Sequence, residues 1–158
     1  MKKIFKLGII IICLFIFTGC NKKTNQEEQK EFYMGDTISI KNFDITFLNY
    51  SIRKAIGSNE KHQDLVFLEV NLKNTSKKEQ RFTNSSYKVF GPDNTELDII
   101  SNSKYTTSLN NVGNIRSDGT TSGHLIFEYA GYGKYYLEFV NTKGSKVTLI
   151  LDIYENIE

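Results

Sequence analysis

The run LVFLEVNLKN at residues 65–74 decides the fold class. Apolar residues occupy every second position from Val66 to Leu72, and polar residues occupy the alternate positions from Glu69 to Lys73. Because successive side chains of a β-strand point to opposite faces, this period of two predicts a strand with one buried face and one wet face. The segment therefore favours a sheet that covers a hydrophobic core on one side.

The same alternation recurs along the chain from Phe32 onward, where no sustained helical periodicity is present. Further strands are expected at residues 37–40, 45–52, 82–90, 96–100, 124–128, 135–140 and 147–153. The alternation changes phase near Leu48, which predicts a β-bulge, and residues 91–94 and 141–145 have the composition of tight turns. Seven or eight short strands in a chain of this size favour an all-β fold, an antiparallel β-sandwich.

The first twenty residues have the layout of an export signal. A head with three lysines precedes the apolar run Leu7–Phe17, and Gly19 stands just before Cys20. The alternative, an uncleaved membrane helix, needs roughly 20 apolar residues, more than this run supplies. The pattern resembles the lipobox of bacterial lipoproteins, although Phe17 stands where a smaller aliphatic residue is usual. The resemblance implies that residues 1–19 are a signal peptide and that Cys20 carries diacylglycerol and palmitate.

Residues 21–31, NKKTNQEEQKE, contain no apolar side chain. Such a segment cannot bury enough surface to offset its ordering entropy, so we expect a flexible tether whose ends lie about 20 Å apart on average. The expected organisation is a signal peptide at 1–19, lipidated Cys20 and a tether at 20–31, and one domain at 32–158. Loss of the leader's three lysines changes the formal net charge from +2 to −1, which excludes the dense basic surface of a nucleic-acid partner.

The sequence offers no constellation for catalysis or metal binding. Cys13 leaves with the leader and Cys20 is the lipidation site, so no thiol remains for a disulfide, a metal or a nucleophile. The two histidines, His62 and His124, are expected to be ordinary surface residues. The turn at residues 93–96 has fewer acidic residues than a calcium loop requires. We therefore expect no enzyme, no metal and no cofactor.

Several short motifs resemble a family of uncharacterised bacterial lipoprotein domains. They are the strand end Val70–Asn74 with its Lys-rich turn, the turn Ser117–Thr121, and the strand Gly123–Glu128. The resemblance spans about residues 32–153 and implies an immunoglobulin-like sandwich similar to a secreted mycobacterial immunoprotective antigen. One departure is Tyr129–Gly133, which stands where the family often has a proline. The abundance of Lys, Asn and Ile is typical of a low-GC genome, which indicates a Gram-positive bacterium.

The longest predicted connection, Ser101–Gly119, is rich in Asn and Ser and nearly free of core residues, as binding loops often are. If the strands are antiparallel, the tether enters beside loops 53–64, 91–95 and 129–134. Loops 74–81, 101–119 and 142–145 then form a rim away from the membrane. On this rim we single out Lys104, Tyr105 and Arg116 as candidate binding residues. The rim also carries Lys77, Lys78, Arg81 and Lys143, which could simply keep the loops soluble.

The tyrosines at 129, 132, 135 and 136 allow two interpretations. They could form an aromatic platform for a glycan or peptide, or belong to a hairpin whose Tyr135 faces the core. We favour the core position, because strands are rich in tyrosine for packing reasons.

A surface anchor without catalytic residues predicts a non-catalytic lipoprotein on the outer face of the cytoplasmic membrane. We expect it to bind another protein of the cell envelope. Two alternatives stay open: capture of a small molecule or metal for a transporter or sensor, and an immunity-type lipoprotein that masks a membrane target.

Overall fold

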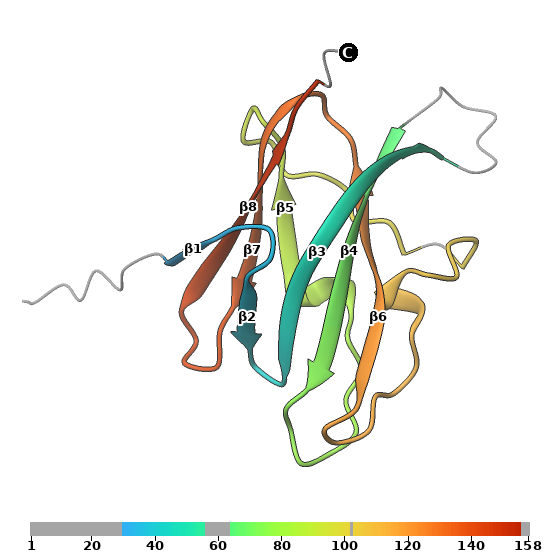
Figure 1. The fold of residues 1–158 in the computed structure, drawn as a ribbon, viewed down its shortest axis with the longest axis vertical. Helices are drawn as coiled ribbons and strands as arrows, with labels where there is room; N and C mark the ends of the chain where they lie inside the picture. The colour runs from blue at the N-terminus through green and yellow to red at the C-terminus, as the bar shows by residue number, and fades with distance from the viewer. Residues whose placement is uncertain (1–29, 56–63, 102, 156–158) are drawn as a thin grey trace, which may run out of the picture.

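The computed structural model describes residues 30–55, 64–101 and 103–155. The expected signal peptide, Cys20, most of the tether and His62 therefore lie outside the described residues. The elements are β1 (Lys30–Phe32), β2 (Thr37–Ile40), β3 (Phe43–Lys54), β4 (Asp64–Asn74), the 3-10 turn η1 (Asn84–Ser86), β5 (Tyr87–Phe90), the 3-10 turn η2 (Leu109–Asn111), β6 (Thr120–Glu128), β7 (Gly133–Val140) and β8 (Lys146–Ile153) (Figure 1).

The described strands form two packed four-stranded sheets, which confirms the predicted β-sandwich. One sheet has the order β1-β8-β7-β5 and the other β2-β3-β4-β6. The neighbours β4 and β6, and the series β5, β7 and β8, match the B–E and C–F–G neighbours of immunoglobulin domains. All named strand pairs are antiparallel except β1 with β8, which is parallel.

The core lies between the sheets and is lined by the alternating residues that the sequence indicated. In β4, Val66, Leu68, Val70 and Leu72 are fully buried. The predicted bulge is also confirmed, because the β3–β4 register shifts between positions 47 and 49 and leaves Leu48 42% exposed. The predicted strand at 96–100 makes only isolated bridges, through Glu96 to β5 and Ile99 to β6, and the predicted strand at 82–90 begins at Tyr87.

A buried tyrosine near the start of β7 closes the connection from β6. The Tyr135 side chain is fully buried, and its hydroxyl accepts a hydrogen bond from the Ala130 amide at 2.7 Å and donates one to the Gly131 carbonyl at 2.7 Å. Gly131 has φ +99°, which a glycine adopts without strain. This arrangement is the tyrosine corner of immunoglobulin-like sandwiches. It confirms that Tyr135 faces the core.

The segment between β5 and β6 is not the core-free loop that we predicted. It buries Tyr105, Leu109 and Ile115. Its backbone also covers the edge of β6, because Ile100 N–H donates to the Ile126 carbonyl at 2.8 Å and His124 N–H donates to the Thr107 carbonyl at 2.8 Å. An uncovered edge strand would leave these groups unpaired. The segment thus closes one side of the sandwich.

The end of β4 is fixed by Asn74, a fully buried polar residue. Its Nδ2 donates to the Lys78 carbonyl at 2.7 Å and the Ile115 carbonyl at 2.9 Å. Its Oδ1 accepts from Ser76 N at 2.9 Å and Ser76 Oγ at 2.8 Å, and its backbone N–H donates to the Gly119 carbonyl at 2.9 Å. We call this arrangement the Asn74 latch. It ties the loop after β4 to the turn before β6, which belong to two of the three motifs on which the resemblance rested.

The described chain does not begin at the end that we predicted. In β1, Lys30 lies beside Val147, at the start of β8. The chain therefore enters next to the hairpin at 141–145, and the expected position beside loops 53–64, 91–95 and 129–134 is wrong. The cause is β1 itself, a three-residue strand too short to show alternation, which lies in one sheet before the chain crosses to β2 in the other.

Candidate functional site

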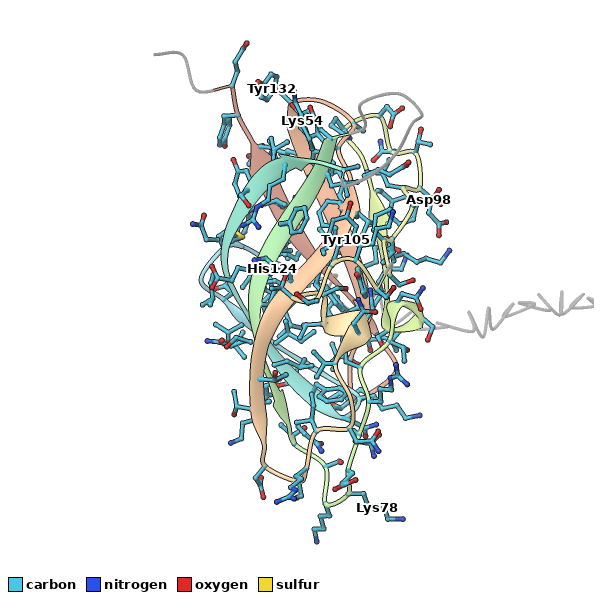
Figure 2. All side chains as sticks on the ribbon, turned by 90° about the vertical axis from the view of Figure 1, so that its right-hand side faces the viewer. Lys54, Lys78, Asp98, Tyr105, His124 and Tyr132 are labelled. Carbon is cyan, nitrogen blue, oxygen red and sulfur yellow. The ribbon has the colours of Figure 1, made fainter. Side chains whose placement is uncertain are left out.

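The three predicted binding residues do not lie together. Tyr105 lies beside the upper half of the sandwich, whereas Lys78 lies at its lower end (Figure 2). The carbonyl of Arg116 is 3.0 Å from Asn74 Nδ2, so Arg116 belongs to the lower end with Lys78. Lys104 and Arg116 are exposed as expected.

Tyr105 itself is not on an exposed rim, because only 6% of it is accessible. It is buried in a second apolar cluster outside the main core, with Leu65, Phe67 and Ile126. The aromatic ring fills the space that these outward-pointing strand residues would otherwise expose to water. Tyr105 therefore packs beneath the surface of this sheet, and too little of its side chain is accessible for it to be a main contact residue.

An arginine and three rings meet on the outer face of the β3-β4-β6 sheet. The Phe67 ring is edge-on to Tyr105, with centroids 5.6 Å apart, and edge-on to His124, with centroids 5.7 Å apart. The guanidinium carbon of Arg53 lies 4.6 Å from the Phe67 centroid. Strand register explains the meeting, since β4 pairs with both β3 and β6 and places Phe67 opposite Ser51 and Ile126. We call Arg53, Phe67, Tyr105 and His124 the Arg53 cluster.

Beside the Arg53 cluster is a hollow of about 110 Å³. Its lining consists of Asn49, Tyr50, Ser51, Arg53, Phe67, Glu69 and His124. Arg53 Nε donates to Ser51 Oγ at 3.0 Å, and no carboxylate of the described chain lies within ion-pair distance of Arg53. A guanidinium that stacks on a ring is held in place while the rest of its planar fork can bind a carboxylate.

The surroundings of His124 lower the pKa of its imidazole and so favour the neutral form. Partial burial lowers the pKa of the imidazole most, and the positive charge of Arg53 lowers it further, while Glu69 opposes both effects. The Nδ1 atom is buried and has no hydrogen-bond partner among the described residues. A neutral ring keeps repulsion from Arg53 low, so the two groups can share one surface.

The hollow contains a serine, a histidine and a glutamate, but they do not form a catalytic triad. A triad needs hydrogen bonds from the nucleophile to the histidine and from the histidine to the acid. Among the described residues, Ser51 Oγ instead accepts from Arg53, and His124 Nδ1 has no partner. Nowhere in the described residues are three His, Cys, Asp or Glu side chains arranged to hold a metal ion.

Neither Arg53 nor Phe67 was predicted from the sequence as a binding residue, although one signal was available. Leu65 and Phe67 interrupt the polar face of the run at 65–74, and apolar residues on both faces indicate that something covers the outer face. The covering segment itself could not be identified from periodicity.

No described helix has the length and apolar character that crossing a bilayer requires.

The fold and this site define an immunoglobulin-like β-sandwich that carries a polar and aromatic cluster on its surface. The chain belongs to the family described as a domain of unknown function, DUF4352, whose sequence profile matches residues 21–147. No curated protein matches the sequence.

Solved structures of similar fold come from several bacteria. The ycdA protein of Bacillus subtilis, a candidate lipoprotein, has a TM-score of 0.59 at 17% identity over 76% of this chain. This chain spans only 39% of the ycdA protein. The yjhA protein of Bacillus subtilis has a TM-score of 0.58 at 12% identity, with 77% of this chain and 99% of that chain covered. An uncharacterised β-sandwich protein of Clostridium difficile has a TM-score of 0.53 at 17% identity, with 79% and 95% covered. At these identities the likeness shows the fold alone.

Proposed function

We propose that this protein is a lipid-anchored, non-catalytic interaction module on the outer face of the cytoplasmic membrane of a Gram-positive bacterium. The lipobox pattern at Cys20 supports the anchor, and a protein of similar fold is itself a candidate lipoprotein. The similarity to the secreted mycobacterial antigen belongs to this proposal and rests on the short motifs at 70–74 and 117–128.

The binding surface that the geometry favours is the Arg53 cluster, together with the exposed Lys104. The observation that carries this assignment is Arg53 stacked on Phe67 without a carboxylate partner among the described residues. Arginine and aromatic residues dominate the energetics of protein interfaces. Rigid strands hold the cluster, so little conformational entropy is lost on binding. The expected partner is an envelope protein that presents a carboxylate to Arg53.

In-cell crosslinking of the anchored protein, followed by pull-down and mass spectrometry, tests this surface. Deleting residues 103–116 is unsuitable as a control because that segment buries Leu109 and Ile115. The Arg53→Ala variant should lose the crosslinked partner. The matched Arg81→Ala and Arg116→Ala variants, in exposed arginines at the lower end, should retain it.

Two results would overturn the proposal. If the Arg53→Ala variant still crosslinks to the partner, the Arg53 cluster is not part of the interface. If the protein turns over a substrate and this activity depends on His124, the protein is an enzyme and not a binding module. The anchor is tested separately. In the Cys20→Ala variant, lipid labelling and membrane retention should both disappear while the crosslinking surface stays intact.

A further inference from the structure

One end of the sandwich carries a concentrated positive charge. The end is formed by the β2–β3 turn, the loop after β4, the turn before β6 and the β7–β8 hairpin, which strand register brings together. Its exposed cations are Lys41, Lys77, Lys78, Arg81, Arg116 and Lys143. Only Glu79 and Asp118 oppose them within these loops. Among the described residues none of the six cations forms an ion pair. We call this surface the basic end.

The opposite end is acidic, so the described part of the molecule is electrically bipolar. Its acidic residues are Asp64, Asp93, Glu96, Asp98, Glu128, Asp152 and Glu155. Its cations in the described chain are Lys54, Lys134 and Lys88, and Lys88 forms an ion pair with Glu96 at 2.9 Å. Figure 2 shows Asp98 in the upper half of the molecule and Lys78 at the lower extreme. A near-neutral net charge thus conceals a separation of charge along the long axis.

The basic end is also hollowed between the two sheets. A cleft of about 540 Å³ is lined by Ile40, Lys41, Asn42, Phe43, Arg81, Ser85, Ser86, Val140, Asn141, Thr142 and Gly144. Lys41 and Arg81 are its charged residues, and no acid lines it. Phe43 and Val140 contribute apolar surface to the cleft, and serine, threonine and asparagine side chains contribute hydroxyl and amide groups. This combination suits a phosphate that is joined to an apolar or neutral body.

The start of the described chain lies on the same side of the molecule. Lys30 is beside Val147, directly after the hairpin that carries Lys143. Only nine residues, 21–29, separate Cys20 from Lys30, so the two Cα atoms are ten peptide units apart. Fully extended, they reach about 35 Å, and as a random coil about 20 Å. A lipid on Cys20 would therefore keep the basic end close to the headgroups.

We propose that the basic end docks on the anionic phospholipid surface of the membrane and that the cleft between Lys41 and Arg81 takes a headgroup phosphate. This inference rests on the proposed lipid anchor. Each Lys or Arg near an anionic surface strengthens attraction roughly 5-fold at physiological salt. The excess of four cations at the basic end therefore predicts an orientation preference of about 600-fold. Docking leaves the Arg53 cluster on the side of the molecule, open to a partner.

The test measures orientation with fluorescent labels on the lipidated protein in vesicles. Cysteines are introduced by Thr75→Cys at the basic end, outside the cleft, or by Tyr154→Cys at the opposite end, both exposed positions. Energy transfer to a headgroup acceptor is compared in phosphatidylglycerol and phosphatidylcholine vesicles. Charge reversal of Lys77 and Lys78 to Glu is compared with the matched reversal of Lys54 and Lys134 to Glu.

Docking predicts stronger transfer from position 75 than from position 154 on anionic vesicles. The difference should vanish on neutral vesicles and on reversal of Lys77 and Lys78, but survive reversal of Lys54 and Lys134. Equal transfer from the two positions, or a difference that neutral vesicles preserve, overturns the proposal. A third result also overturns it: transfer from position 75 is weak, and reversal of Lys77 and Lys78 abolishes crosslinking to an acidic protein. The basic end would then bind that protein and not the membrane.

The anchor and the docking surface can fail separately. Flotation of the lipidated chain against the Cys20→Ala chain tests the anchor alone. If the lipid is absent, binding of the Cys20→Ala chain to phosphatidylglycerol vesicles at low salt still tests the basic end. Binding that falls at least 10-fold on reversal of Lys77 and Lys78 supports docking, and a smaller effect or no binding overturns it.

Discussion

Removing the Asn74 side chain should be among the most damaging single changes in this domain. The Asn74 amide donates to the carbonyls of Lys78 and Ile115 and accepts two hydrogen bonds from Ser76. Each bond contributes about 1 kcal/mol net, and burial of the partners prevents water from replacing all of them. The Asn74→Ala variant should therefore lose about 3–4 kcal/mol of unfolding free energy, a large part of the stability of a small domain.

Urea unfolding of the purified protein measures this loss as a lower midpoint with an unchanged m-value. A matched control is Asn141→Ala, whose side chain accepts two backbone hydrogen bonds in an accessible hairpin and should cost about 1 kcal/mol. The Asn74→Asp variant keeps the acceptor but cannot donate, and it should be at least as unstable as Asn74→Ala. Equal losses for Asn74→Ala and Asn141→Ala, or an Asp variant close to wild type, would refute the reasoning.

Hydrogen exchange locates the same effect. Amides of residues 75–81 and 115–119 should lose protection in Asn74→Ala, because the latch joins those two loops. Amides of the β7–β8 hairpin should keep their protection, because the latch makes no bond to it. If protection is lost uniformly over the domain, the latch stabilises the whole fold and not these two loops in particular.

Three further predictions follow from single contacts. Tyr135→Phe removes both hydrogen bonds of the tyrosine corner and should lower stability by about 1–2 kcal/mol in thermal or urea unfolding; an unchanged midpoint would remove the corner from the stability of the fold. In Gly123→Ala the new Cβ would lie 2.8 Å from Leu109 Cδ2 and 2.8 Å from a backbone carbonyl oxygen. This variant should lose about 1–3 kcal/mol of unfolding free energy. If the contact with the Leu109 side chain dominates, the double variant Gly123→Ala/Leu109→Ala should lose less unfolding free energy than the sum of the two single variants. The folded-state pKa of His124 is lowered, so the unfolded chain binds its proton more readily as the pH falls below about 6.5. Stability should therefore be fully present above that pH and decrease toward pH 5, and His124→Asn should flatten this dependence in a pH series of urea midpoints; an unchanged slope would contradict it.

Much of the fold could be predicted because alternation reports burial directly. The run around Val66, the bulge at Leu48 and the core position of Tyr135 all follow from a local period or its interruption. The burial of Leu109 and Ile115 could not be predicted in this way. They are isolated apolar residues in a polar segment, and their burial depends on contacts with strands distant in the sequence.

The candidate site was less predictable than the fold. Exposure of Lys104 and Arg116 follows from composition, but their separation depends on the path of the segment that joins β5 to β6. The contact between Arg53 and Phe67 depends on the register of β3 with β4 after the bulge. A shift of one residue would place Arg53 on the other face of the sheet. The sequence pattern of a strand predicts which face of the sheet each residue lies on, but the contacts of a site depend on the register between neighbouring strands.

The short strand β1 has a mechanical consequence. If the proposed lipid on Cys20 anchors the protein, force from the membrane enters the domain through β1, which pairs in parallel with β8 at three positions. When a partner bound at the Arg53 cluster is pulled away from the membrane, tension passes from the anchor into β1 along the direction of β8. The hydrogen bonds between the two strands are then loaded together in shear, not opened one at a time. An attachment of three residue pairs can in this way resist a force that would peel an antiparallel end strand from its sheet.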